Sequence, residues 1–207
     1  MEKVAALVLT AGASRRMGTP KALLPWGQTT VIQHLLDQIR QAGFTETLLV
    51  TGAHHDVIQK ALAVEGVEIS LHPSWELGMG STISRGVQEV EERFSDIDAI
   101  LILLVDQPRI THGYLRRVLE AHQSQPDVII ASDYGDFAGA PALFPRNFWE
   151  GLKRIPPTQG ARKLIASYRD KCVILDPGGA IVDIDTPEAY KKALSVYLSN
   201  QTKNVNE

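Results

Sequence analysis

The sequence predicts an α/β protein with a mostly parallel central sheet and helices on both of its faces. Short runs rich in Val, Ile and Leu alternate along the chain with longer segments whose apolar residues recur at helical spacing. The most apolar run, AILILLV at 99–105, is too short to cross a membrane and suits a strand buried on both faces. Strands that alternate with helices in this way pair in parallel through right-handed crossovers.

The first half of the chain gives a regular series of elements. The run KVAALVLT at 3–10 predicts a buried strand, and the apolar spacing at 30–44 predicts a helix that ends near Gly43. After them we expect strands at 46–52, 67–73, 99–105 and 127–132, and helices at 55–63, 79–94 and about 111–124.

The second half is less regular, and it contains no linker, repeat or low-complexity segment. We therefore expect one domain over 1–199, in which 133–180 elaborates the regular sheet, followed by a polar, frayed tail over 200–207. Within this half we expect helices at about 147–154, 159–169 and 187–199, and strands at 172–175 and 181–184.

Composition and charge exclude several classes of protein. The net charge of −3 gives no broad basic surface for nucleic acid. The single cysteine, Cys172, excludes an intramolecular disulfide bond. The sequence has no apolar run long enough to span a membrane, and its N-terminus lacks the design of a secretory leader. We expect a cytoplasmic protein with no nucleic-acid or membrane partner.

A loop of unusual composition, AGASRRMGTPK at 11–21, follows the first predicted strand. Parallel sheets bind their ligands at this edge, beyond the carboxyl ends of the strands. Gly12 lets the backbone approach a ligand closely, and Arg16 and Lys21 can bind phosphate oxygens. The loop is neither a Walker A motif nor G-x-G-x-x-G. Gly12 alone could form only a turn, but the whole combination favours phosphate binding.

Two acidic segments stand at predicted strand ends. Asp106 follows the most apolar strand, where Mg²⁺ could bind between one or two carboxylates and phosphate oxygens. The alternative is that Asp106 only forms a turn before Pro108. Asp183 and Asp185 alternate along a predicted strand, which would place both on one face, while Thr186 is a candidate helix cap.

A glycine-rich helix entry, WELGMGSTIS at 75–84, is a candidate binding segment. The start of a helix after Gly78 and Gly80 can bind an anion or meet the edge of a base. Ser81 and Thr82 are candidate contacts, and the alternative for Ser81 is that it merely caps the helix.

These motifs together resemble the MobA-like nucleotidyltransferases, and most closely the molybdenum cofactor cytidylyltransferases. The likeness extends from Val4 to about Tyr190 and includes LTAGASRRMGTPK, DQP at 106–108, GAPALF at 139–144, GAR at 160–162 and DIDTP at 183–187. The resemblance implies a single-domain Rossmann-like nucleotidyltransferase fold, with a nucleotide-binding part over about 1–130 and an acceptor side over about 133–180. It implies nucleotide binding by Leu9, Thr10, Ala11, Gly12, Ser14, Gly18, Gly80 and Ser81.

The resemblance also implies roles for the charged residues. Lys21, Arg16 and Asp106 would act in catalysis, and Asp106 and Asp185 would bind Mg²⁺. Arg162 is a candidate for the acceptor phosphate, against the alternative of a surface helix arginine. Pro157-Thr158-Gln159 stands where the family commonly has Gly-Asp, so acceptor specificity is less firmly implied.

The implied reaction is transfer of CMP from CTP to the terminal phosphate of molybdopterin, with release of pyrophosphate and passage of the product to a molybdenum hydroxylase apo-protein. In this family the residue before the loop glycine separates CTP users from GTP users, and Ala11 favours CTP. Two alternatives remain: a nucleotidyltransferase with another base or acceptor (GTP, a sugar phosphate or an isoprenoid precursor), and a non-catalytic cofactor carrier. We interpret His54 and His55 as surface residues and Trp26, Trp75 and Trp149 as packing residues.

Overall fold

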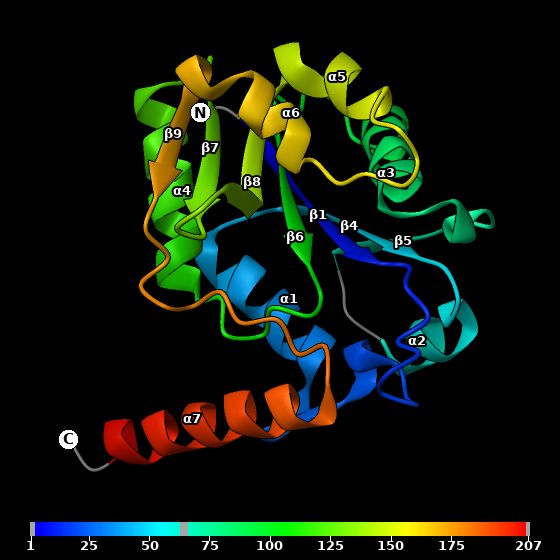
Figure 1. Cartoon of the computed structure of the whole chain (residues 1–207), viewed down its shortest axis with the longest axis vertical. Coiled ribbons are helices and arrows are strands. Elements are labelled where there is room, and N and C mark those ends of the chain that lie inside the picture. The colour runs from blue at the N-terminus through cyan, green and yellow to red at the C-terminus, as the bar shows by residue number, and fades with distance from the viewer. Residues whose placement is uncertain (1–2, 63–65, 206–207) are drawn as a thin grey trace.

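The computed structural model describes residues 3–62 and 66–205, and it places a seven-stranded sheet at the centre of the molecule (Figure 1). Every strand is parallel to its neighbours except β8, which pairs in antiparallel fashion with both β6 and β7. The expectation of a mostly parallel sheet is therefore confirmed. In spatial order the strands are β5 (Val67–Leu71), β4 (Glu46–Thr51), β1 (Val4–Thr10), β6 (Ala99–Leu104), β8 (Ala138–Pro145), β7 (Ile129–Asp133) and β9 (Cys172–Leu175).

Helices cover both faces of the sheet, as the sequence predicts (Figure 1). Each face has its own cluster of buried apolar side chains, because successive residues of a strand point to opposite sides. One cluster contains residues of α1 (Val31–Ala42), α2 (His55–Ala61), α4 (His112–Ser124) and α7 (Pro187–Val205). The other contains residues of α3 (Met79–Arg93), α5 (Trp149–Lys153) and α6 (Arg162–Ser167).

Strand β1 shows this alternation most clearly. Ala6 and Val8 belong to the cluster under α1, whereas Ala5 and Leu7 belong to the cluster under α3, and all four are fully buried. On the α3 side the helix approaches closely because Gly86 has no side chain: a Cβ there would lie 2.7 Å from Leu7 Cδ1. This packing fixes the carboxyl end of β1, where the loop at 11–21 begins.

The order of the strands creates a switch point beside β1. From β1 the chain adds β4 and β5 on one side and then returns to add β6 on the other. At such a point the connections leave β1 and β6 in opposite directions, and a crevice opens beyond their carboxyl ends. The loop after β1 and Asp106, two residues beyond the end of β6, therefore meet at this crevice.

Several elements differ from the prediction. Strand β8 and a small hairpin, β2 (Pro25–Trp26) with β3 (Thr29–Thr30), were not expected, because β8 contains Pro141 and the hairpin strands are only two residues long. Residues 181–184 form no strand: the segment crosses the carboxyl edge of the sheet and has no ladder partner. Helix α7 ends at Val205, beyond the predicted helix end at 199. The last two residues of the predicted tail, 206–207, lie outside the described residues.

Within the described part of the chain, no helix combines the length and the apolar character that crossing a bilayer would require. Two of the three tryptophans pack in the core as expected, with Trp26 fully buried and Trp149 exposed by only 1%.

Candidate functional site

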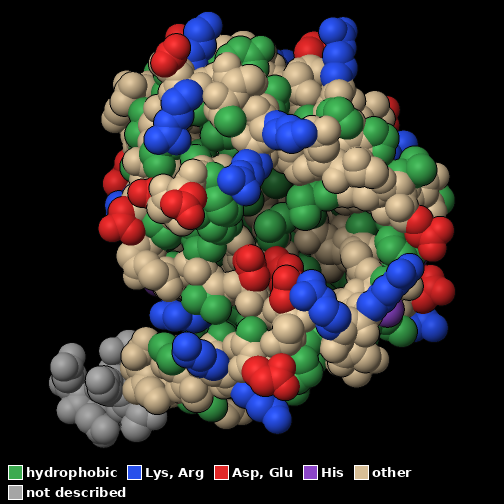
Figure 2. Space-filling model, in the orientation of Figure 1, with side chains coloured by type: hydrophobic (Ala, Val, Ile, Leu, Met, Phe, Trp, Pro, Cys, Tyr) green, Lys and Arg blue, Asp and Glu red, His purple; other side chains and the backbone are tan. Residues whose placement is uncertain are grey.

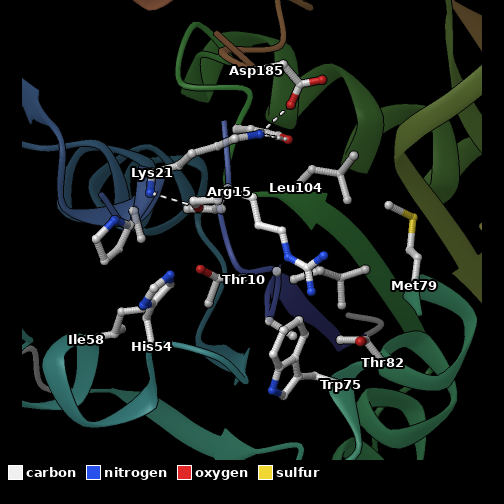
Figure 3. Close-up of a pocket in the computed structure, with 18 of the residues that line it drawn as sticks. Thr10, Arg15, Lys21, His54, Ile58, Trp75, Met79, Thr82, Leu104 and Asp185 are labelled. Atoms are coloured by element: carbon white, nitrogen blue, oxygen red, sulfur yellow. Dashed lines mark hydrogen bonds and ion pairs between the residues drawn. The ribbon is translucent and has the colours of Figure 1, made fainter. Parts of the chain in front are cut away.

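A cavity of about 480 Å³ opens at the switch point. Figure 2 shows the hollow on this face of the molecule, with acidic side chains beside it and Lys and Arg side chains on its border. The loop after β1 and the end of β6 form one side, and the start of α3 and part of α2 form the other (Figure 3). The lining residues are Leu9, Thr10, Ala11, Gly12, Ser14, Arg15, Arg16, Pro20, Lys21, Ala22, His54, Ile58, Trp75, Glu76, Gly78, Met79, Thr82, Leu104, Val105, Asp106 and Asp185.

The loop keeps its shape through its own backbone and side chains. Ser14 and Gly18 both have positive φ, 50° and 67°, and Ser14 is one of the few residues other than glycine in that conformation. The Ser14 hydroxyl accepts a hydrogen bond from the Lys21 amide at 3.1 Å, and its carbonyl accepts one from the Met17 amide at 2.9 Å. Ser14 and Gly18 therefore set the path of the loop and, with it, the position of Lys21.

Two contacts tie the loop to the segment after β4. The Ala53 amide donates to the Ala11 carbonyl at 3.1 Å, and His54 Nε2 lies 3.0 Å from the Ala13 carbonyl. Gly52 makes this approach possible, because a Cβ there would lie 2.6 Å from the Ala11 carbonyl oxygen and from Trp75 Cγ. The loop is thus held against the β4 side of the crevice.

A cluster of four charged residues closes the β6 end of the cavity. The Lys21 ammonium lies 3.1 Å from Asp106 Oδ2 and also forms an ion pair with Asp185. Arg16 pairs with the other oxygen of Asp185 at 3.3 Å. Asp185 reaches the cluster because the Ile184 amide donates to the Asp106 carbonyl at 2.9 Å, which fixes the 183–185 segment against the end of β6.

Burial and charge shift the pKa values of this cluster in different directions. Burial raises the pKa of Asp106, and the nearby Lys21 charge offsets that shift only in part. The hydrogen bond from Lys21 lowers the pKa of Asp185, which is more exposed. Burial lowers the pKa of Lys21, but the charges of Asp106 and Asp185 outweigh it, so the net shift is upward. Lys21 therefore remains protonated, and Asp185 ionises more readily than Asp106.

The donor set at this cluster fits a hard divalent cation. Across the described residues there is no group of three or more His, Cys, Asp or Glu side chains that could hold a metal ion by themselves. Asp106 and Asp185 nevertheless place carboxylate oxygens around one cation, the Lys21 ammonium. Magnesium at nucleotide sites commonly takes only one or two carboxylates, with phosphate oxygens and water completing its shell.

Most of the predicted site residues meet in this cavity. Nine of them line it, from three separate parts of the chain: Leu9, Thr10, Ala11, Gly12, Ser14, Arg16, Lys21, Asp106 and Asp185. Gly18 belongs to the same loop but is not among the lining residues, and Gly80, Ser81 and Arg162 also lie outside the lining.

The start of α3 differs from its predicted role as an open anion-binding end. The amides of Gly80 and Ser81 donate to the Pro157 carbonyl, at 2.8 Å and 3.4 Å. The segment after α5 can pack here because Gly80 has no side chain; a Cβ would lie 2.2 Å from the Pro156 carbonyl oxygen. The Ser81 hydroxyl donates to the Gly78 carbonyl at 2.7 Å and so does not cap the helix either.

Arg162 lies at the end of a stack of side chains on the β7 side of the sheet edge. Its guanidinium lies 3.7 Å from the centroid of the Phe137 ring, and Phe137 stacks on Tyr134 at 4.5 Å. The Tyr134 hydroxyl in turn accepts a hydrogen bond from Gln107 at 2.7 Å. Arg162 is therefore oriented by aromatic contacts rather than free on a helix surface.

Several lining residues were missed or misread from the sequence. Trp75 and His54 both line the cavity, a role that their interpretation as a packing and a surface residue did not include. Arg15 extends from the loop toward Trp75 and Thr82 (Figure 3). The signal that could have found His54 is its place in the turn after β4, at the same sheet edge as the loop.

Asp183 and Asp185 do not share a face, because their segment is not a strand. Asp183 accepts a hydrogen bond from Gln107 Nε2 at 2.9 Å, whereas Asp185 pairs with Lys21 and Arg16. The two carboxylates therefore have separate partners.

The chain is similar to known proteins over most of its length. Residues 6–172 match the MobA-like NTP transferase domain. The nicotine blue oxidoreductase of Paenarthrobacter nicotinovorans is 31% identical over 121 residues, which are 58% of this chain and 57% of that protein. A probable molybdenum cofactor guanylyltransferase of Bacillus cereus is 27% identical over 131 residues, which are 63% of this chain and 62% of that protein. The matched region spans less than two thirds of the length of both relatives.

A solved structure, that of Rv0371c from Mycobacterium tuberculosis H37Rv, matches nearly the whole chain. It has a TM-score of 0.81 and 30% identity, and the match covers 94% of this chain and 98% of that one. The complex of the same protein with manganese has a TM-score of 0.77 and 28% identity, covering 93% and 98%.

Proposed function

The chain belongs to the MobA-like NTP transferase family, and from this premise we propose that it is a molybdenum cofactor cytidylyltransferase. In the proposed reaction an oxygen of the terminal phosphate of molybdopterin attacks the α-phosphorus of CTP. The bond from that phosphorus to the bridging oxygen breaks, CMP is transferred, and pyrophosphate leaves. The observation that carries the proposal is the meeting of Lys21, Asp106 and Asp185 beside the loop at 11–21.

The loop would bind the β- and γ-phosphates of the nucleotide. Its backbone is held open at Gly12, where a Cβ would meet no atom within 4 Å, so a ligand can approach the main chain. Lys21 and Arg16 would neutralise the charge that develops on the departing pyrophosphate. Little covalent chemistry falls to the protein, and positioning together with electrostatics would supply the catalysis.

Asp106 and Asp185 would hold the magnesium ion that we expect as cofactor. A divalent ion there would neutralise phosphate charge and polarise the α-phosphoryl group. The Rv0371c complex with manganese, a relative of the same fold, supports a divalent-metal site in this chain.

The base preference rests on the first residues of the loop. Ala11 is exposed by only 6% and lines the cavity beside Thr10. Its methyl group occupies space that a glycine would leave open to a larger base, which favours CTP over GTP. The guanylyltransferase relative makes GTP the competing donor.

The acceptor would bind on the β7 side, where the stack of Tyr134, Phe137 and Arg162 begins next to Gln107. Arg162, oriented by its stacking on Phe137, would bind an acidic group of the acceptor beside the sheet edge. Delivery of the finished cofactor to a molybdenum hydroxylase apo-protein would follow.

The decisive experiment measures pyrophosphate release with molybdenum-loaded molybdopterin, Mg²⁺ and each of the four nucleoside triphosphates. We expect release with CTP, lost in Asp106→Ala and retained in Asp136→Ala, an exposed acidic residue in the turn after β7. Release with GTP alone would contradict the base assignment. Tight molybdopterin binding without pyrophosphate release from any triphosphate would contradict the enzyme proposal and favour a cofactor carrier.

A further inference from the structure

A buried amide links the end of β6 to two other parts of the chain. Gln107 is exposed by only 1%. Its Nε2 donates to Tyr134 Oη at 2.7 Å and to Asp183 Oδ1 at 2.9 Å. One side chain next to Asp106 therefore holds both the turn after β7 and the segment that leads into α7.

The orientation of this amide is fixed by its partners. If the amide were flipped, its oxygen would face the Asp183 carboxylate, and two acceptors would be in contact without a hydrogen between them. In the orientation found, Oε1 is buried and has no hydrogen-bond partner among the described residues. A buried acceptor without a partner opposes folding, so the stability of the fold alone does not explain why a glutamine stands here.

The bond to Asp183 fixes the segment that places Asp185. On one side of Asp185 the Ile184 amide donates to the Asp106 carbonyl at 2.9 Å, and Ile184 itself is fully buried. The residue before Ile184 is Asp183, which accepts the hydrogen bond from Gln107. Because the segment forms no ladder with the sheet, these two bonds fix the backbone that leads into Asp185, whose carboxylate pairs with Lys21 and Arg16.

We propose that the Gln107–Asp183 hydrogen bond is a positioning device for Asp185, and that Asp183 acts through this bond rather than as a metal ligand. The inference rests on the proposed function, because it concerns the carboxylates assigned to the metal. It is supported by the separation of the two aspartates: no group of three acidic side chains among the described residues could hold a metal ion. The Oδ1 of Asp183 faces Gln107, while Asp185 faces Lys21.

Two substitutions of Asp183 separate a hydrogen-bond role from a charge role. Asp183→Asn keeps an oxygen that can accept from Gln107 but removes the charge, whereas Asp183→Ala removes both. Asp183 is exposed, so both variants should fold. Gln107→Met keeps the volume of the side chain and removes the donor.

The readout is Mn²⁺ binding, which is measured directly by electron paramagnetic resonance with CTP present and without the acceptor. We expect Asp183→Ala and Gln107→Met to weaken Mn²⁺ binding roughly tenfold or more. Asp183→Asn should stay within about threefold of the wild-type protein, because only a nearby charge in water is lost.

Three results would overturn the inference: an Asp183→Asn variant as weak as Asp183→Ala, unchanged binding in both Asp183→Ala and Gln107→Met, or no Mn²⁺ binding by the wild-type protein. If Gln107→Met fails to fold, the Asp183 pair decides alone. Mn²⁺ binding needs no acceptor, so it can be measured whether or not the protein catalyses the transfer. Absence of nucleotidyl transfer in the pyrophosphate assay would therefore contradict the proposed reaction but not the positioning role of Asp183.

Discussion

The ammonium nitrogen of Lys21 lies 3.1 Å from Oδ2 of Asp106, although the two residues are 85 positions apart in the sequence. The same nitrogen pairs with Asp185, another 79 positions further along, so one cation joins three distant segments at the sheet edge. Each of these side chains is partly withdrawn from water, and breaking a pair in such a setting leaves a charge without its partner. An arriving nucleotide would give Lys21 phosphate oxygens in place of a carboxylate, which frees the carboxylate for a cation.

Replacing Lys21 should lower activity with CTP. In Lys21→Met we expect kcat/KM for CTP to fall roughly a hundredfold or more, since a charge stabilising the departing phosphates is lost. Steady-state kinetics with varied CTP would measure the effect. The control is Lys60→Met, an exposed lysine on α2 away from the cluster. Equal losses in both variants would show that the effect does not come from the cluster.

The raised pKa of Asp106 predicts an acid limb in the pH profile. Burial raises this pKa above its ordinary value of 3.8, so as pH falls Asp106 takes up its proton before an exposed aspartate would. A protonated Asp106 no longer binds a cation, and Mn²⁺ binding should therefore weaken as pH falls. In Lys21→Met the limb should move to higher pH, because the Lys21 charge lowers the pKa of Asp106. Titration of Mn²⁺ binding from about pH 4 to 8 would show the shift; a limb that moves to lower pH would contradict this account.

The fold and the loop side of the cavity were accessible from the sequence because local patterns determine them. The strand run at 4–10 and its loop follow from apolar periodicity and from Gly12, Arg16 and Lys21. The position of Asp106 follows from the rule that ligands meet the carboxyl ends of parallel strands.

The remainder depends on tertiary contacts that no local pattern reports. The Pro157 carbonyl accepts hydrogen bonds at the start of α3, although it is far from that helix in the sequence. The contacts of Gly80 and Ser81 could therefore not be predicted from the residues next to them in the chain. Asp183 and Asp185 alternate like strand residues, but their segment forms no ladder with any strand in the described part of the chain. The contacts that line the cavity from α2 and α3 also arise only when the segments after β4 and β5 come together.

Two glycines, Gly80 at the start of α3 and Gly12 in the loop, should respond differently to alanine. In Gly80→Ala the new methyl group would lie 2.2 Å from the Pro156 carbonyl oxygen, so we expect a loss of about 1–3 kcal/mol in stability. In Gly12→Ala nothing lies within 4 Å, so stability should change by less than about 0.5 kcal/mol. Gly12→Ala should instead weaken CTP binding, because the backbone can no longer be approached closely. Thermal unfolding and calorimetric titration with CTP would measure the two effects, and a stable Gly80→Ala protein would contradict the packing argument.

The stack that orients Arg162 should affect the acceptor and not the nucleotide. Phe137→Leu removes the ring beneath the guanidinium, 3.7 Å away, and we expect KM for molybdopterin to rise roughly fivefold. KM for CTP should stay the same, since Phe137 does not line the cavity. Phe137→Tyr keeps the stacked ring and is the matched control. A rise in KM for CTP, or an unchanged KM for the acceptor, would contradict the assignment of Arg162 to the acceptor site.

The residue before the loop glycine should set the choice of base. Ala11 is nearly buried and lines the cavity, so in Ala11→Gly the lost methyl group leaves room for a purine. We expect the ratio of kcat/KM for GTP to that for CTP to rise roughly tenfold, the scale that one methyl group contributes to discrimination. Glycine also loosens a loop, which would weaken both nucleotides equally. Ala13→Gly, in the same loop but outside the cavity lining, measures that effect alone. If Ala11→Gly lowers both activities in proportion, as Ala13→Gly should, then base choice lies in the segments that face the loop across the cavity.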